Sequence, residues 1–316
     1  MSLWLAVLLF VLGLALVIAF AEKLVAGVVG AAAGFGVSAF WLSVVFIGFD
    51  PENLAVGAAG AYARSFGIAL GSIIGASMVA VGLALGITAM IVPLKFGKAP
   101  RRILLIPLVT VGAVWGLMLD GVLGRLDGML LLAGYAASVA YLLHLNRKGV
   151  DIRAGGEVAE TLGRQQPAGR WKSVATAALA LAAIIVGSEM IVRSSERIIE
   201  GLGWSDTLFG MTLLALLVSI EELARELPAA LKHRPDITYG NVLGSVLAFF
   251  LFNAGIIALV RPVQVNGRTM WFYMPMCIIT VAATSAMMAS RRISRLAGLL
   301  LVALYAFFVA FGYMNE

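Results

Sequence analysis

Four acidic residues lie where long apolar runs of the sequence are interrupted. Asp50 and Glu52 belong to Gly48-Phe49-Asp50-Pro51-Glu52-Asn53, and Glu221 and Glu222 belong to Ser219-Ile220-Glu221-Glu222. A carboxylate inside an apolar segment is costly unless it is paired, hydrated or bound to a cation, so it indicates function. Each stretch also predicts a helix start, because Asp50 before Pro51 is a favourable N-cap and Ser219 with Glu222 forms a capping box. Two half-helices with acids in their first turns favour a cation site inside a transporter.

The acids suit a hard cation. Ca²⁺ takes roughly six to eight oxygen ligands, and Glu52 and Glu222 would supply two anionic groups, with Asp50 and Glu221 as further acids. Crowded carboxylates also bind protons, so protons could replace sodium as the counter-substrate. Asp50 could equally serve only as an N-cap, and Glu221 could pair with a group elsewhere. Glu226, beside Arg225, is expected to form an ion pair.

The composition predicts an integral membrane protein. Hydrophobic residues make up 61% of the 316 residues and charged residues 13%, which is unlike a soluble globular domain. The net charge of +6 does not indicate nucleic acid, because the basic residues lie in short loops between apolar runs. We expect an all-α fold of ten membrane spans, at 3–21, 25–62, 67–92, 103–121, 127–145, 172–193, 205–231, 238–260, 270–289 and 294–313, with the second and seventh broken near the midplane.

The two halves of the chain repeat. Glu52 and Glu222 are 170 residues apart, and Pro93 and Pro262 are 169 apart. Since each half has five spans, the copies must be inverted across the membrane, and the site should form where they meet. The domains predicted are residues 1–145 and 172–316, joined by a polar cytoplasmic connector at 146–171. The excess of basic residues on one side predicts that both termini lie outside, and the plasma membrane is the expected location.

With these acids, broken spans and repeated halves, the sequence resembles the sodium/calcium exchangers, as a divergent member of that family. Those proteins have inverted five-helix repeats, each with a Gly-Thr-Ser-x-Pro-Glu motif followed by Gly-Asn-x-x-Gly-Ser-Asn on the next helix. The resemblance implies that Glu52 and Glu222 are the repeat glutamates, and it places family ligand positions at Ser219, Ser245 and Asn241. Apart from the resemblance, Ser72 is a further hydroxyl that could add a neutral oxygen or orient the acids.

This sequence departs from the family motifs at several expected ligands. Ala76, Ala80 and Phe249 stand at positions where the family carries polar side chains. Ser77 and Asn253 are neighbours that could substitute only if the register or rotamers shift. The departures leave the transported ion and the coupling ion open.

The resulting prediction is a secondary antiporter, and not an enzyme, that exchanges a small inorganic cation, Ca²⁺ first, for Na⁺ or H⁺. No cofactor is expected beyond these cations. The partners expected are the lipid bilayer and inorganic cations, and a monomer suffices. One alternative is a non-transporting scaffold or sensor with the same fold, and another is a transporter for a different cation. A membrane enzyme that binds metal at Asp120 and Asp127 is the rival from another class.

Overall fold

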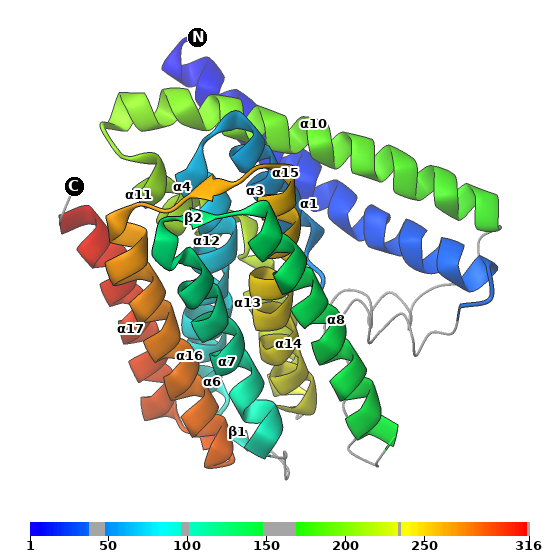
Figure 1. The fold of residues 1–316 in the computed structure, drawn as a ribbon, viewed down its shortest axis with the longest axis vertical. Helices are drawn as coiled ribbons and strands as arrows, with labels where there is room; N and C mark the ends of the chain where they lie inside the picture. The colour runs from blue at the N-terminus through cyan, green and yellow to red at the C-terminus, as the bar shows by residue number, and fades with distance from the viewer. Residues whose placement is uncertain (38–47, 96–100, 148–168, 233–234, 315–316) are drawn as a thin grey trace.

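The computed structural model describes residues 1–37, 48–95, 101–147, 169–232 and 235–314, and it is almost entirely helical (Figure 1). The first half contains α1 (Leu3–Gly34), α3 (Pro51–Ala63), α4 (Phe66–Leu70), α5 (Ala76–Met78), α6 (Leu85–Ile91), α7 (Arg101–Leu117) and α8 (Arg125–Arg147). The second half contains α10 (Arg170–Leu202), α11 (Asp206–Phe209), α12 (Ala215–Val218), α13 (Glu221–Leu231), α14 (Pro235–Leu247), α15 (Ala254–Val260), α16 (Met274–Ala289) and α17 (Arg295–Met314).

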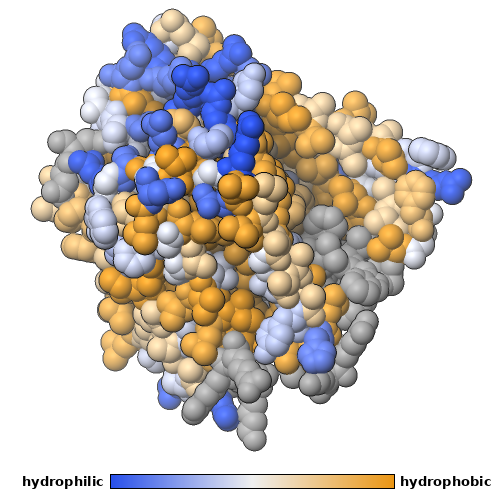
Figure 2. Space-filling view, viewed as in Figure 1, coloured by the Kyte–Doolittle hydropathy of each residue, from blue (hydrophilic) through white to orange (hydrophobic). Residues whose placement is uncertain are grey.

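The predicted all-helical membrane fold is confirmed. The described ranges include eight helices long and apolar enough to cross a membrane, and the bent pair Asp206–Val218 and Glu221–Leu231 makes a ninth if it is one span. Large apolar side chains face outward from several of these helices, among them Trp4, Val109, Leu126, Leu179, Trp271 and Leu296. Figure 2 shows hydrophobic residues over the flanks of the bundle and hydrophilic ones gathered at its upper end. Because the second predicted span includes residues 38–47, which lie outside the described residues, the number of ten spans stays a prediction.

Two helices are longer than the sequence predicted. Helix α1 continues to Gly34 and α10 to Leu202, whereas the predicted spans end at residues 21 and 193. The prediction of a second span from residue 25 is therefore wrong, since residues 25–34 extend α1. The charged residues at these points do not end the helices: Lys23 lies 4.3 Å from the centre of the Phe20 ring, and Arg197 pairs with Glu200 one turn away at 2.8 Å. In Figure 1, α1 and α10 lie side by side and extend beyond the rest of the bundle.

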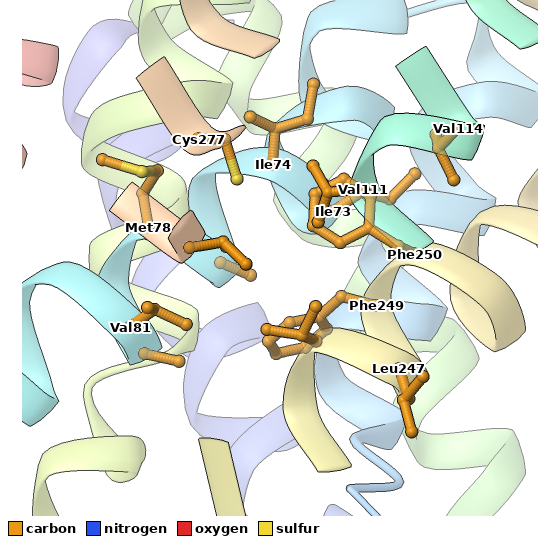
Figure 3. Packing of buried hydrophobic residues seen from close by; sticks show 14 of the residues in the cluster. Ile73, Ile74, Met78, Val81, Val111, Val114, Leu247, Phe249, Phe250 and Cys277 are labelled. Carbon is orange, nitrogen blue, oxygen red and sulfur yellow. The ribbon is translucent and has the colours of Figure 1, made fainter. Parts of the chain in front are cut away.

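The core of the bundle is formed by two interrupted helices. Residues 66–91 and 240–260 are mostly buried, and π-helical turns interrupt both, at Gly71–Gly75, Val79–Ala84 and Ala248–Asn253. Figure 3 shows their apolar side chains meeting in the centre, including Ile73, Phe249 and Phe250. Single π-turns inside α-helices are frequent at functional sites.

Contacts between helices follow the sequence repeat. Gly86 on α6 packs against Gly298 on α17, where an added Cβ would lie 2.9 Å from the Gly298 carbonyl oxygen. The positions 169 and 170 residues away, Gly255 and Gly128, make the corresponding contact between α15 and α8, at 3.0 Å. The short strands follow the same repeat. Strand β1 (Leu94–Lys95) pairs with β4 (Arg292–Ile293), and β2 (Val122–Leu123) pairs with β3 (Val263–Gln264), both antiparallel. Such reciprocal contacts are expected of two halves related by a two-fold axis, while the inverted arrangement itself stays a prediction.

The chain breaks where the acids predicted it, although only one helix start has the predicted cap. Helix α3 begins at Pro51, and the Asp50 side chain accepts a hydrogen bond from the Asn53 backbone N–H at 2.8 Å. The second break separates α12 from α13, which are bent by 46°. The predicted capping box at Ser219 is wrong, because α13 starts after Ile220 without a side-chain cap. The Ser219 hydroxyl instead accepts a hydrogen bond from the first half of the chain.

Candidate cation site

The first break is held against the second half of the chain by a backbone contact. Gly48 has a left-handed φ of +66°, and a Cβ added there would lie 2.0 Å from the carbonyl carbon of Gly244 on α14. No side chain can occupy that space, so glycine lets the chain pass directly over α14. Two residues later Asp50 is almost fully buried, as are Glu52 and Asn53.

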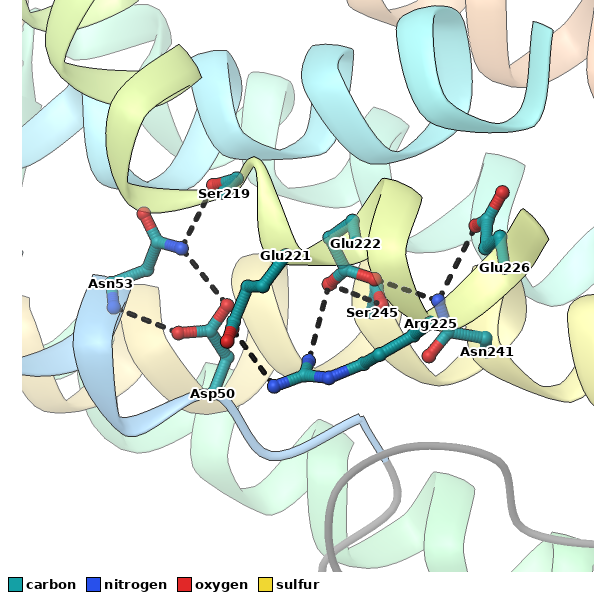
Figure 4. A network of polar contacts seen from close by, with 9 residues as sticks. All are labelled: Asp50, Asn53, Ser219, Glu221, Glu222, Arg225, Glu226, Asn241 and Ser245. Atoms are coloured by element: carbon teal, nitrogen blue, oxygen red, sulfur yellow. Dashed lines mark hydrogen bonds and ion pairs between the residues drawn. The ribbon is translucent and has the colours of Figure 1, made fainter. Parts of the chain in front are cut away.

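Asn53 joins the two breaks. Its side-chain Nδ2 donates to Asp50 Oδ2 at 2.9 Å and to Ser219 Oγ at 2.9 Å (Figure 4). Asp50 and Ser219 come from opposite halves of the chain, so one amide links the start of α3 to the turn before α13. The Asn53 Oδ1 atom is buried and accepts no hydrogen bond from the described residues. Asn53 was not among the predicted ligands, although an asparagine three residues after a helix cap is well placed to bond to it.

Three carboxyl groups gather at this junction. Asp50, Glu52 and Glu221 each offer a carboxylate oxygen, and these oxygens lie within 4.8 Å of one another. Asp50 and Glu52 are buried, and Glu221 is partly buried. Acids from both halves therefore lie close together, but the glutamate of the second half in this group is Glu221, whereas the predicted pair was Glu52 and Glu222. Successive residues of a helix point about 100° apart, so Glu221 and Glu222 face different neighbours.

Glu222 faces α14 and forms a second polar cluster. Asn241 Nδ2 donates to its Oε2 at 2.7 Å, and Ser245 Oγ donates to its Oε1 at 3.2 Å. The same Asn241 amide reaches Glu226 Oε1 at 3.3 Å, while Glu226 Oε2 has no hydrogen-bond partner in the described part of the chain. Glu222 and Glu226 are both about 1% exposed. These contacts place the predicted residues Asn241 and Ser245 around Glu222.

Arg225 links the two clusters. Its Nη2 lies 2.8 Å from Glu221 Oε1 and its Nη1 lies 3.9 Å from Glu222 Oε1. No ion pair of Glu226 lies within the described ranges, so the ion pair expected at that residue stays a prediction. Adjacent helical residues point in different directions, whereas residues three and four apart share a face. The spacing of Arg225 from Glu221 and Glu222 was the signal in the sequence.

Two of the predicted neutral ligands have other partners. Ser72 Oγ donates to the Ala69 carbonyl at 2.8 Å and packs against Gly57 of α3. Ser77 lies 3.9 Å from the Cys277 sulfur on α16, and it has no hydrogen bond to the acids in the described residues. Phe249 is fully buried in the apolar core (Figure 3).

The two acids of the alternative enzyme hypothesis, Asp120 and Asp127, each cap a loop. Asp120 Oδ1 accepts from the Val122 N–H at 3.0 Å, and Asp127 Oδ2 accepts from the Gly124 N–H at 2.7 Å. The Asp120 residue is exposed. Both carboxylates thus have an ordinary structural role at the turn before α8.

The fold and the site together define an all-helical integral membrane protein with acidic groups converging in its interior. The family model for sodium/calcium exchanger proteins matches residues 5–144 and 172–314. The chain is 31% identical over 139 residues to the sodium/calcium exchanger MaX1 of Methanosarcina acetivorans, covering 44% of this chain and 40% of MaX1. It is 26% identical over 158 residues to the Ca²⁺/H⁺ antiporter ChaA of Bacillus subtilis, covering 49% of this chain and 44% of ChaA.

Solved structures of the sodium-calcium exchanger NCX_Mj have the same fold. One, soaked with Na⁺ and Ca²⁺, is 26% identical and superimposes with a TM-score of 0.61, over 97% of this chain and 98% of that one. The chain belongs to the sodium/calcium exchanger family.

Proposed function

We propose that this protein is a secondary antiporter that exchanges Ca²⁺ for Na⁺ or H⁺ by alternating access. The observation that carries the proposal is the convergence of Asp50, Glu52 and Glu221 at a junction between the two halves, with carboxylate oxygens within 4.8 Å of one another. Buried acids in a membrane protein mark ion pathways and proton relays. The names of MaX1 and ChaA support calcium as the exchanged ion and leave two coupling ions open.

The donor set suits a calcium ion as substrate. Ca²⁺ binds carboxylates in one- or two-oxygen mode together with amide and backbone carbonyl oxygens. Three carboxyl groups and the Asn53 Oδ1 atom, which accepts no hydrogen bond from the described residues, are all oxygen donors of this kind. The Asn53 amide directs its N–H groups to Asp50 and Ser219, so its oxygen is the end left to meet a cation.

Glu222 supports proton coupling as one of the two options. Its carboxyl group and that of Glu226 are buried and share the Asn241 amide. This cluster has the composition of a proton relay inside a membrane. Ala76, Ala80 and Phe249, where the family motif has polar ligands, remove oxygens that would otherwise suit sodium.

A non-transporting scaffold is the second candidate, and buried Phe249 in place of a polar ligand favours it. The two candidates differ in a flux assay. Purified protein in liposomes should accumulate ⁴⁵Ca²⁺ under an outward gradient of Na⁺ or of protons, and E52Q and E222Q should reduce that uptake at least about tenfold, because each removes an anionic group from the interior. E200Q, at an exposed ion pair of α10, is the matched control and should transport normally.

The outcomes are distinct. Absence of Ca²⁺ uptake under both gradients, with no Ca²⁺-dependent thermal shift, would refute the calcium antiporter and leave the scaffold and the transporter of a different cation. Uptake under a Na⁺ gradient alone would exclude proton coupling, and uptake under a proton gradient alone would exclude sodium.

The arrangement in the cell is part of the same proposal. The protein lies in the plasma membrane with both termini outside, and a monomer carries out transport. Residues 1–145 and 172–316 form the two repeats, and the cytoplasmic connector 146–171 joins them; most of that connector lies outside the described residues.

A further inference from the structure

A positively charged side chain lies among the acids of the candidate cation site. The Arg225 guanidinium contacts Glu221 at 2.8 Å and approaches Glu222 to 3.9 Å. Glu221 belongs to the three-carboxylate group, and Glu222 belongs to the cluster on α14. Arg225 therefore holds one acid of each cluster (Figure 4).

The helix geometry explains this position. Long side chains in a helix point back towards its N-terminus, and the acids occupy the first turn of α13, one turn before Arg225. Only 14% of the Arg225 side chain is exposed, so water screens its charge weakly. An arginine remains protonated in proteins, and its charge is thus a constant feature of the site.

A cation bound between Asp50, Glu52 and Glu221 would use the same Glu221 carboxylate that Arg225 contacts. The bound cation and the Arg225 guanidinium, both in contact with the Glu221 carboxylate, would repel each other. At low effective dielectric this repulsion is strong. The fixed charge also neutralises part of the acidic cluster, and this reduces the number of mobile cations that the cluster attracts. Both effects act on the ion that enters the site.

We propose that Arg225 is a built-in counter-cation that competes with the transported cation for Glu221 and Glu222. It lowers the affinity of the site and sets how many mobile ions it takes up. This inference rests on the proposed cation site, and it makes Arg225 a determinant of affinity and coupling ratio.

The test compares a neutral variant with one that keeps the charge. Ca²⁺ affinity is measured by isothermal titration of purified full-length protein in nanodiscs, for the wild type, R225Q and R225K. R225Q should bind Ca²⁺ at least about tenfold tighter, because a unit charge is removed from the site, and R225K should stay within about threefold of the wild type. R193Q, at an exposed arginine of α10, is the matched control and should not change the affinity. R225M is the second neutral variant, which retains the aliphatic packing should R225Q fold poorly, and it should also bind more tightly.

The coupling ratio gives an independent measure. The number of counter-ions moved per Ca²⁺ in proteoliposomes should increase in the neutral variants. Equal affinity in the wild type and the folded neutral variants, weaker binding in those variants, or tighter binding in R225K as well would each overturn the role of Arg225 while leaving the cation site intact. A lack of Ca²⁺ binding in the wild type and in both neutral variants would instead refute the cation site itself.

Discussion

Gly48→Ala tests whether a backbone contact holds the two halves of the site together. An alanine Cβ at this position would lie 2.0 Å from the Gly244 carbonyl carbon and 2.1 Å from its oxygen. Backbone atoms of a packed helix cannot move aside as a flexible side chain can, so the break before α3 must shift away from α14. Asp50 is two residues from the substitution and would shift with it.

The loss of stability expected for Gly48→Ala has two parts. The left-handed φ of +66° costs a non-glycine residue about 1–2 kcal/mol, and overpacking against the core costs roughly 1–3 kcal/mol more. Gly203, at the end of α10, separates these parts, because its φ is +70° and an added Cβ would meet nothing within 4 Å. Gly203→Ala should therefore show only the cost of the backbone conformation.

The assay is equilibrium unfolding of both variants in mixed micelles, together with the Ca²⁺-dependent shift of the thermal midpoint. We expect Gly48→Ala to be more destabilising than Gly203→Ala by about 1–3 kcal/mol and to lose the Ca²⁺ shift, which Gly203→Ala should keep. If the two variants were equally stable and both kept the shift, the contact between Gly48 and α14 would not position the site.

Two further predictions concern side chains. Asn53→Ala removes the donor to Asp50 and Ser219 and should lower the unfolding free energy by about 1–3 kcal/mol, because it leaves the buried Asp50 Oδ2 atom without its hydrogen bond. Ser219→Ala, which removes only the hydroxyl acceptor, should cost less in the same measurement, and the reverse order would contradict this view of the bridge. Glu189→Gln breaks an ion pair with Arg193, and both side chains of this pair are more than half exposed. The unfolding free energy should therefore change by less than about 0.5 kcal/mol. A larger loss would mean that this pair is shielded from water.

Local signals in the sequence predicted much of the fold. The apolar runs, the N-cap at Asp50 before Pro51 and the repeat offset of 169 to 170 residues concern composition or neighbours in the chain. The limits of α1 and α10 were missed for a physical reason: charged residues were expected to end the spans at the membrane surface. In the structure Lys23 lies over the Phe20 ring and the charged end of α10 pairs along its own surface, and both helices continue past these residues.

The sequence alone determined which acidic residues interrupt the apolar runs, because an acid in such a run is evident from its neighbours. It also predicted the breaks at Asp50-Pro51 and at Ser219. Only the tertiary structure decided how those acids divide, with Glu221 beside Asp50 and Glu52, and Glu222 beside Asn241. That division depends on the direction in which α13 leaves its bend and on the close contact of Gly48 with α14, both of which arise from packing between residues far apart in the chain.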